Sequence, residues 1–285
     1  MGAKIIDGKA IAAKIRQRVR AKIAALRKQG KRPPGLAVIL VGHDPASSIY
    51  VRNKRQACEE VGILSSYHPL PADVSQNKLI RLIEDLNADP SVDGILLQLP
   101  LPKHIQPETV LECIKPEKDI DGFHPYNLGR LAQYRPLLEP CTPHGIMLLL
   151  QHIKLPCKGK HAVILGSSNI VGKPLIFELL AAGCTITICN SLTKNLSKQV
   201  AEADILVSAI GKPGFVKGKW IKKGATVIDV GITQLPNGSV TGDIEFEAAK
   251  AQARWITPVP GGVGPMTVAV LLSNTLEAYS LAKKH

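Results

Sequence analysis

Short apolar runs alternate with helical patterns along the first 100 residues, and this alternation limits the possible fold more than any other feature. The apolar runs lie at residues 36–42, 65–70 and 94–99, and the helical patterns lie near 9–28, 46–61 and 76–88. Continuously apolar strands separated by helices are typical of a parallel sheet that is covered on both faces. We therefore expect an α/β fold in this part of the chain.

A second series of the same kind follows a helical pattern for which Thr142 is the expected N-cap, with Pro143 at the first helical position. Its strand candidates are residues 161–166, 185–189, 204–209 and 226–230. This spacing predicts a compact Rossmann-like unit. The helical pattern at 268–282 has no strand left to pair with, so we expect it to pack back on the first half. The predicted domains are residues 1–140 with 267–285, and residues 141–266.

The composition is that of an ordinary globular chain, with 285 residues of which 45% are hydrophobic. No segment approaches the roughly 20 apolar residues that span a bilayer, and the first 30 residues lack a signal-peptide pattern. We therefore expect a cytoplasmic protein with no membrane partner. The six cysteines form no C-x-x-C pair and match no zinc module, which predicts reduced thiols and no metal site.

The net charge of +13 is concentrated in residues 1–60, which hold 14 Lys or Arg and four acidic residues. Many of these basic residues alternate with an apolar stripe, as on the solvated face of an amphipathic helix. No recognition motif accompanies the charge, and only 4% of residues are aromatic, so we expect no nucleic-acid partner. The positive charge also suits small polyanions, such as a dinucleotide phosphate or a glutamylated substrate.

The stretch I-L-G-S-S-N-I-V-G-K-P at residues 164–174 follows a predicted strand and opens a predicted helix. The pyrophosphate of a dinucleotide binds at such a place, on backbone amides at a helix N-terminus. The spacing is Gly166 and Gly172 with Ser168 between them, instead of G-x-G-x-x-G. On spacing alone, a plain strand-to-helix turn is the alternative interpretation.

The end of the next strand bears on the choice of cofactor. An NAD site usually places Asp or Glu there to bind the ribose 2′-hydroxyl. This chain has C-N-S-L-T-K at residues 189–194, with no acidic residue. Ser191, Thr193 and Lys194 suit a 2′-phosphate instead, which predicts NADP as the cofactor.

The stretch P-V-P-G-G-V-G-P-M-T at residues 258–267 packs three prolines and three glycines ahead of the last helical pattern. Glycine allows backbone torsions that other residues avoid, and proline fixes φ. One interpretation is a tight strand-to-helix turn. The other is a rigid wall against which a flat ligand lies.

Polar residues that suit chemistry stand at three places in the first half. Tyr50 and Lys54 have i,i+4 spacing in a helical pattern, so they share a face, as residues of a surface stripe also do. Gln98 lies at the end of an apolar strand, where a site residue or a hydrogen-bonded core amide is expected, because an unpaired buried amide costs roughly 1–3 kcal/mol. Asp121 precedes Gly122, as in many turns.

Five motifs and the stretch at 164–174 resemble, in order, those of the methylenetetrahydrofolate dehydrogenase/cyclohydrolase family. The five are S-I-Y-V-R-N-K (48–54), D-G-I-L-L-Q-L-P-L-P (93–102), D-I-D-G-F-H-P-Y-N-L-G-R-L (119–131), P-C-T-P-H-G-I (140–146) and the stretch at 258–267. The resemblance implies oxidation of 5,10-methylenetetrahydrofolate with NADP⁺, and then hydrolysis of the methenyl product to 10-formyltetrahydrofolate. It also implies a folate substrate and a homodimer.

The same resemblance implies roles for individual residues. Lys54 would transfer protons, Gln98 would hold its amine, Tyr50 would stack on the substrate, and Asp121 would accept hydrogen bonds from the pterin; these four form the expected catalytic set. Folate contacts are expected from Tyr50, Gln98, Leu99, Pro100, Asp121, Pro260, Gly261, Gly262 and Val263. Cofactor contacts are expected from Gly166, Ser167, Ser168, Ile170, Gly172, Asn190, Ser191 and Ile232.

Two positions depart from the pattern of many relatives, which carry Arg in place of Ser167 and His in place of Asn190. The missing Arg removes one expected phosphate partner. Two other interpretations remain open at this point. An NADP-dependent dehydrogenase of a different small substrate would need a catalytic Lys–Asp pair near the cofactor loop. A basic, non-enzymatic scaffold would bind nucleic acid with a strong salt dependence.

Overall fold

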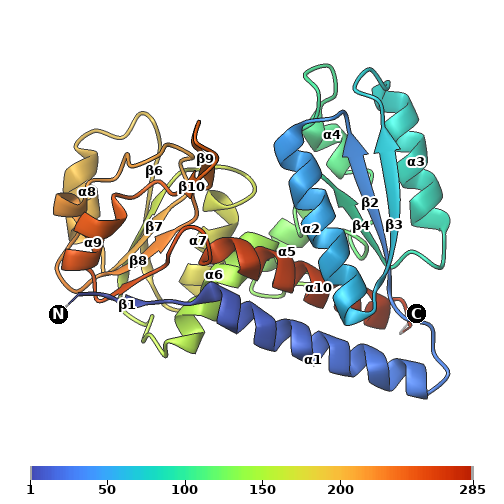
Figure 1. Ribbon diagram of the computed structural model, residues 1–285, viewed down its shortest axis with the longest axis horizontal. Coiled ribbons are helices and arrows are strands. Elements are labelled where there is room, and N and C mark those ends of the chain that lie inside the picture. Colours follow the sequence, from blue (N-terminus) through green and yellow to red (C-terminus); the bar gives the residue numbers. More distant parts are fainter. Residues whose placement is uncertain (1, 284–285) are drawn as a thin grey trace. The chain divides into compact units, whose positions relative to one another are not determined.

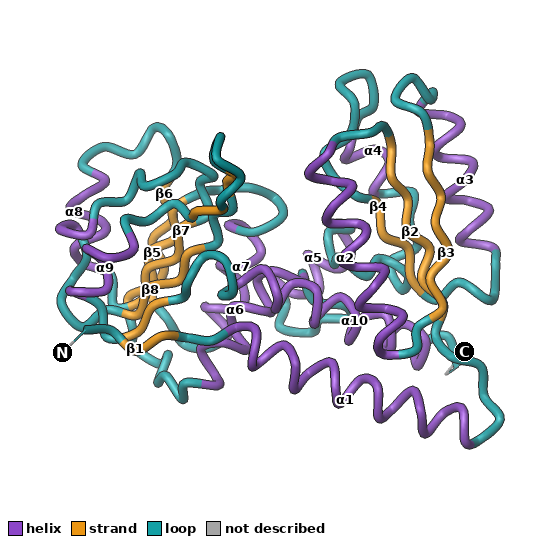
Figure 2. The backbone as a smooth tube through the Cα atoms, viewed as in Figure 1, coloured by secondary structure: helices purple, strands orange, loops and turns teal. Residues whose placement is uncertain are grey.

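The computed structural model describes residues 2–283, and these form two compact units (Figures 1 and 2). The six-stranded unit comprises the described residues up to Ala13 together with residues 142–267, and the three-stranded unit comprises the rest. Sequence analysis placed residues 1–13 with the other half of the chain. The structure groups the described residues 2–13 with the six-stranded unit because β1 (Lys4–Ile5) pairs in parallel with β11 (Trp255–Ile256).

The three-stranded unit is built on a parallel sheet of order β3-β2-β4. Its strands are β2 (Gly35–Val41), β3 (Leu64–Leu70) and β4 (Gly94–Leu97). Its helices are α2 (Pro45–Val61), α3 (Gln76–Ala88), α4 (Pro107–Leu111) and α5 (Pro125–Ala132), with most of α1 (Gly8–Lys28) and α10 (Val263–Leu281). Figure 1 shows α2 and α3 on opposite faces of the sheet.

Central strand β2 is buried along its whole length, because strands flank it on both sides and helices cover both faces. Its alternate residues Ala37, Ile39 and Val41 pack with Leu79 and Ile83 of α3 in one apolar cluster. This is the period of two that a strand imposes on its side chains. A strand buried on both faces must be apolar throughout, which explains the continuous run in the sequence.

The six-stranded unit has a fully parallel sheet of order β1-β11-β8-β7-β5-β6. Beyond β1 and β11, its strands are β5 (His161–Leu165), β6 (Thr185–Cys189), β7 (Ile205–Ser208) and β8 (Thr226–Asp229). A short antiparallel pair, β9 (Thr233–Gln234) and β10 (Val240–Thr241), follows β8. The chain runs from β5 to β6 on one side and returns to β7 on the other, so the strand order reverses at β5. Ligands bind at the carboxyl ends of strands at such a reversal.

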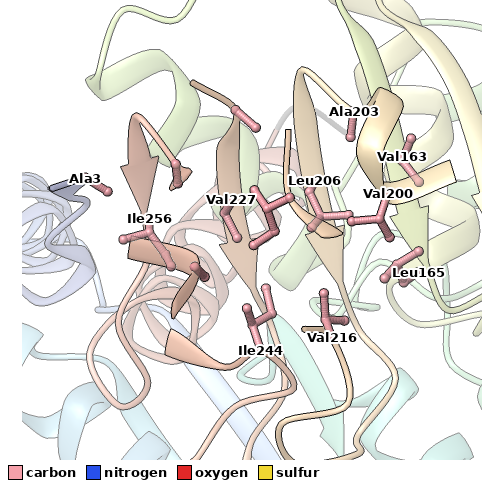
Figure 3. Close-up of a cluster of buried hydrophobic side chains, with 14 of the residues drawn as sticks. Ala3, Val163, Leu165, Val200, Ala203, Leu206, Val216, Val227, Ile244 and Ile256 are labelled. Carbon is pink, nitrogen blue, oxygen red and sulfur yellow. The ribbon is translucent and has the colours of Figure 1, made fainter. Parts of the chain in front are cut away.

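Helices cover both faces of this sheet. They are α6 (Cys141–His152), α7 (Gly172–Ala181), α8 (Leu196–Glu202), α9 (Phe246–Gln252) and the 3₁₀ turn η1 (Gly218–Trp220). Figure 1 places α8 and α9 on one side of the strands and α7 on the other. Figure 3 shows the apolar cluster beneath α8, where Val163, Leu206 and Val227 of neighbouring strands meet Val200.

The predicted α/β fold is confirmed, and the predicted strands and helices are found with ends shifted by a few residues at most, apart from the start of the last helix. Helix α10 begins at Val263, ahead of the expected Val268, because Pro265 falls in the first turn, where a missing N–H costs nothing. Helix α6 begins at Cys141, so Thr142 is inside it instead of capping it. Its hydroxyl lies 2.9 Å from that of Thr267.

The last helix packs on the three-stranded unit, as expected. Residues 268–283 belong to that unit, and the Arg32 guanidinium lies 5.1 Å from the Tyr279 ring centroid. No helix within residues 2–283 is long and apolar enough to cross a membrane.

Candidate active site

Lys54 and Gln98 form a hydrogen-bonded pair at the carboxyl end of β4. Helix α2 begins after Asp44, whose side chain accepts a hydrogen bond from the Ser47 backbone N–H at 2.7 Å. Further along this helix, the Lys54 Nζ donates to the Gln98 Oε1 at 3.2 Å. Both side chains are half-buried. A helix and a strand end thus bring together two residues 44 positions apart.

Hydrogen bonds fix the orientation of Gln98. Its Nε2 donates to the Leu99 carbonyl at 2.7 Å, and its backbone N–H donates to the Ile39 carbonyl at 3.0 Å. Because the amide nitrogen is used in this way, the amide oxygen faces the Lys54 amine. An amide orients an amine without adding a negative charge beside it.

Other expected folate contacts surround this pair. Tyr50 lies one helical turn before Lys54 and is 40% exposed, and partial burial raises the pKa of its hydroxyl. Leu99 is half-buried, Pro100 is exposed, and a cis peptide bond joins them. An exposed aromatic ring near a polar pair offers a stacking surface for a flat ligand.

Asp121 adds a carboxyl group to the same cluster. Burial raises its pKa, the positive charge of Lys54 opposes that shift, and the nearby Asp119 adds to it. Asp119 is itself 2% exposed and accepts a hydrogen bond from the His124 backbone N–H at 2.8 Å, which holds the turn. The three-stranded unit therefore gathers an amine, an amide and a carboxyl group from three separate segments.

Sequence analysis did not identify Asn274, which supports the turn that carries Asp121. Its side-chain amide is buried in the three-stranded unit and donates to the carbonyls of Ile120 and Glu139, each at 2.8 Å. The Cys141 thiol donates to the Ile120 carbonyl as well, at 3.2 Å. Asn274 and Ile120 are 154 positions apart, so no local pattern marks their contact.

The glycines at 258–267 serve a tight turn. Gly261 has a φ of +107°, and a Cβ on Gly262 would lie 2.6 Å from the Pro258 carbonyl oxygen. Gly261, Gly262 and Val263 are buried, and Val263 is the first residue of α10, whereas Pro260 is exposed. Their expected contact with folate stays a prediction, and for the buried glycines it would have to come from the backbone.

The stretch at 164–174 forms a tight turn between β5 and α7. Gly166 has a φ of +111°, and a Cβ on Gly172 would lie 1.9 Å from the Gly166 carbonyl oxygen. The N–H groups of Ser167 and Ile170 have no backbone acceptor within residues 2–283. Free amides ahead of a helix N-terminus fit a bound phosphate. The residues present therefore fit the pyrophosphate of a dinucleotide.

The segment after β6 holds its own shape by hydrogen bonds. The Asn190 backbone N–H donates to the Thr193 hydroxyl, and the Leu192 N–H donates to the Asn190 side chain, both at 2.9 Å. Asn190, Ser191 and Lys194 are exposed at the carboxyl end of the strand. No acidic residue stands among residues 189–194.

Two buried carboxyl groups that sequence analysis did not identify shape the loops after β7 and β8. Asp243 accepts a hydrogen bond from the Lys212 N–H at 2.8 Å, and Asp229 accepts from the N–H groups of Gly231 and Asp243, both at 3.0 Å. The loop held by Asp229 presents Ile232, which is 45% exposed. For Asp229, the sequence signal was an acidic residue at the end of an apolar strand.

These features define a two-domain α/β enzyme with a dinucleotide-binding unit and a separate unit that carries an amine–amide–carboxyl cluster. Residues 140–283 match the family model "tetrahydrofolate dehydrogenase/cyclohydrolase, NAD(P)-binding domain", and residues 6–121 match its "catalytic domain". The chain belongs to the tetrahydrofolate dehydrogenase/cyclohydrolase family.

Solved structures of this family resemble the chain over its whole length. A bifunctional methylenetetrahydrofolate dehydrogenase/cyclohydrolase from Campylobacter jejuni is 46% identical, with 98% of this chain and 99% of that one covered and a TM-score of 0.95. The Trypanosoma brucei enzyme, solved with NADP and an inhibitor, is 40% identical, with full coverage of both chains and a TM-score of 0.96. A Bombyx mori methylenetetrahydrofolate dehydrogenase is 40% identical, with 99% and 100% covered and a TM-score of 0.93.

Proposed function

We propose that this protein oxidises 5,10-methylenetetrahydrofolate with NADP⁺ and hydrolyses the methenyl product to 10-formyltetrahydrofolate. The observation that carries the proposal is the cluster of Lys54, Gln98 and Asp121, whose members are far apart in the sequence and meet in the fold. Family membership and the glycine turn of the six-stranded unit support the same conclusion.

The oxidation step requires a hydride acceptor and a fixed substrate. NADP⁺ supplies the acceptor when it is bound. Asp121 would hold the pterin by accepting hydrogen bonds from its amino and ring N–H groups, which are donors that match a carboxylate. Tyr50 would stack on the aryl group. Hydride transfer depends on such positioning more than on acid–base help.

The hydrolysis step requires proton transfer. Water attacks the amidinium carbon of the methenyl cation, and Lys54 would take a proton from that water and return it to the ring nitrogen as the ring opens. The positive charge of the substrate favours a neutral amine beside it. Gln98 supports this role because its oxygen holds the amine, while its nitrogen is bound to the Leu99 carbonyl.

NADP is favoured over NAD because the segment after β6 has hydroxyl and amine side chains and no carboxylate. Ser191 and Lys194 are exposed there and suit a 2′-phosphate. Ser167 provides a hydroxyl and a free backbone N–H, so it replaces only part of the phosphate contact that an Arg would give.

The surface and the cysteines bear on three further proposals, which are the oligomeric state, the form of the folate and the cellular location. A homodimer through β3 is supported by the free edge of that strand, since β3 pairs only with β2 within residues 2–283, and by the exposed side chains of Leu64 and Tyr67. The basic surface of residues 1–60 favours a polyglutamylated folate. The free cysteines fit a reducing, cytoplasmic location.

The alternative dehydrogenase requires a Lys–Asp pair near the cofactor turn. An ion pair of this kind is present in the six-stranded unit, with the Lys222 Nζ 2.6 Å from the Asp204 Oδ1. Asp204 immediately precedes β7, so the pair lies at the amino edge of the sheet, whereas Gly166 follows β5 at the carboxyl edge. The pair is therefore on the wrong edge for that chemistry.

The direct test is an assay with methylenetetrahydrofolate and either NADP⁺ or NAD⁺ that follows reduced nicotinamide and methenyl product together. We expect both products to form, with the higher kcat/KM for NADP⁺. No reduction of either dinucleotide would refute the proposed function, and a higher kcat/KM for NAD⁺ would refute the cofactor assignment.

A further inference from the structure

Two cysteines lie side by side at the amino edge of the six-stranded sheet, opposite the edge that carries the glycine turn. Cys157 lies in the turn before β5, and Cys184 immediately precedes β6. Two backbone hydrogen bonds join these segments, from Gly159 N–H to the Gly183 carbonyl and from Thr185 N–H to the Lys160 carbonyl, both at 2.8 Å. These backbone hydrogen bonds thus hold the two cysteines next to each other.

The side chain of Cys184 is in direct contact with Cys157. The Cys184 thiol donates a hydrogen bond to the Cys157 carbonyl at 3.3 Å, which holds its sulfur beside Cys157. Cys184 is 6% exposed, whereas Cys157 is half-exposed. One sulfur is therefore accessible to a small reagent, and the other lies behind it as a partner.

The interaction between the two neighbouring thiols makes the exposed thiol the more acidic of the two. It lowers the pKa of Cys157 to about 7 and raises the pKa of Cys184. The charged groups nearby include Lys158 and Lys160, which follow Cys157 before β5, and Asp204, which is paired with Lys222. Cys157 therefore has substantial thiolate character at neutral pH, which is the form that reacts with oxidants.

We propose that Cys157 and Cys184 form a redox-active modification site, which hydroperoxides oxidise to a reversible disulfide. In the first step the Cys157 thiolate attacks the outer peroxide oxygen, the O–O bond breaks, and the alkoxide or hydroxide released takes up a proton. This converts Cys157 to a sulfenic acid and reduces the peroxide to an alcohol or water.

In the second step the Cys184 sulfur attacks the sulfenic sulfur of Cys157. The S–O bond breaks, and the hydroxide released takes the Cys184 proton and leaves as water. Once Cys157 is no longer a thiolate, its negative charge no longer raises the pKa of Cys184, which favours this step. The two thiols together lose two hydrogen atoms, and a thiol reductant restores them.

The disulfide would close a loop that contains β5, the glycine turn and α7. Cross-linking a loop of this length restricts the unfolded chain and stabilises the folded unit. The cofactor residues follow the strands at the opposite edge, so cofactor binding should change little. This inference does not depend on the proposed function.

The test is oxidation of the intact protein with hydrogen peroxide at neutral pH, followed by mass spectrometry of the whole chain and of its peptides. We expect the mass of the whole chain to fall by that of two hydrogen atoms. We also expect a single cross-linked peptide that joins Cys157 to Cys184, and full reversal of both changes by dithiothreitol. The oxidised protein should have a thermal midpoint several degrees higher. Oxygen added at Cys157 without a cross-link, or no change in mass, would overturn the proposal.

Iodoacetamide alkylation at different pH values provides a second readout. At pH 7, a pKa of about 7 gives roughly 16-fold more thiolate than an ordinary thiol of pKa about 8.5, and the lower intrinsic nucleophilicity removes roughly fivefold. We therefore expect Cys157 to react roughly threefold faster than an ordinary cysteine. In Cys184→Ser, the pH midpoint for Cys157 should rise, and the cross-link should be absent.

Cys113→Ser is the matched control. Cys113 is also half-exposed, but its thiol donates to the Thr109 carbonyl, and burial raises its pKa. This variant should form the cross-link at the wild-type rate. If Cys113→Ser abolishes the cross-link, or if Cys184→Ser leaves the pH midpoint of Cys157 unchanged, the assignment of the pair is wrong.

Discussion

The candidate sites of the two units differ in what they are built from, which is side chains in one unit and backbone in the other. In the three-stranded unit the candidate site consists of side chains, since Lys54, Gln98 and Asp121 come from a helix, a strand end and a turn. In the six-stranded unit the candidate site consists of backbone, since Gly166 and Gly172 bring chain segments too close together for any side chain. Side-chain sites tolerate substitution without loss of the fold, whereas backbone sites depend on the absence of a Cβ.

This difference predicts separable effects. Substitutions in the amine–amide–carboxyl cluster should remove chemistry and leave dinucleotide binding intact. Substitutions at the glycine turn should weaken dinucleotide binding and leave hydrolysis of a supplied methenyl folate intact. The five predictions that follow test this contrast.

The largest effect is expected for Lys54→Met, which removes the amine and keeps most of the side-chain stem. Hydrolysis of methenyltetrahydrofolate should fall by at least about 100-fold, the usual contribution of a positioned acid–base group. The fold and NADP affinity should stay close to wild type. Lys78→Met, on the exposed surface of α3, is the control and should retain full activity. Full hydrolysis by Lys54→Met would remove this residue from the mechanism.

Asp121→Asn should impair both activities together, since both act on the same bound pterin. The change replaces one acceptor with a donor that faces a substrate donor, and this should cost roughly 2–4 kcal/mol in folate binding or turnover. NADP affinity, measured by calorimetry in the absence of folate, should be unchanged. Normal folate affinity with normal rates would show that Asp121 is only a turn residue.

Gly172→Ala should disturb the dinucleotide unit, because the added Cβ would lie 1.9 Å from the Gly166 carbonyl oxygen. Moving that backbone should cost roughly 1–3 kcal/mol of stability and raise the KM for NADP⁺ at least tenfold. The matched control is Gly129→Ala in α5, where no atom lies within 4 Å of the added Cβ, and where Ala should stabilise the helix by about 0.5–1 kcal/mol. Equal effects of the two substitutions would contradict the proposed close approach.

The stability of the six-stranded unit should depend on pH through Asp229. Burial raises the pKa of Asp229 to about 7, the charge of Asp243 adds to this, and backbone N–H groups oppose it. A carboxyl group with a raised pKa binds its proton more tightly in the folded state, so its contribution to stability is complete below pH 4 and is lost as the pH rises through 7. Denaturant unfolding should therefore show a stability decrease over this range, on the order of a few kcal/mol from this group.

Asp229→Asn should remove much of that pH dependence, because the amide has no proton to lose. The measurement is the free energy of unfolding at pH 5 and pH 7.5 for both proteins. Asp229 would be ionised throughout if the free energy of unfolding of the wild type rises from pH 5 to pH 7.5 and that of Asp229→Asn changes by the same amount.

The smallest effect is expected for Ser191→Asp, an exposed change at the end of β6. A carboxylate there should repel the 2′-phosphate and accept a hydrogen bond from a free 2′-hydroxyl. We expect the ratio of kcat/KM for NADP⁺ to that for NAD⁺ to fall by roughly tenfold, which corresponds to about 1.4 kcal/mol. An unchanged ratio would place the 2′-phosphate elsewhere.

Much of the fold could be predicted from the sequence, because the elements that form it carry local signals. The buried strand β2 is apolar throughout, and α3 has apolar residues at helical spacing, so both were located to within one residue. The strands β1 and β11 were not among the strand candidates, since each has only two residues and is held by pairing with neighbouring strands.

The candidate site could be predicted in part. Motifs identified Lys54, Gln98 and Asp121, which the structure brings together. No sequence pattern indicated the contacts that hold the turn with Asp121. Asn274 acts through the carbonyl of Ile120, and such contacts leave no pattern in a sequence. The start of α10 was misplaced because proline normally marks a helix boundary, whereas Pro265 lies inside the first turn.

The most direct test of the account is hydrolysis of methenyltetrahydrofolate by the wild-type protein with no dinucleotide present. The claim is that the side-chain cluster of the three-stranded unit performs this step with its own residues. The account predicts enzyme-dependent loss of the methenyl absorbance, with 10-formyltetrahydrofolate as the product and a rate proportional to protein concentration. A rate equal to that of buffer alone, under conditions where the same preparation oxidises methylenetetrahydrofolate, would contradict it.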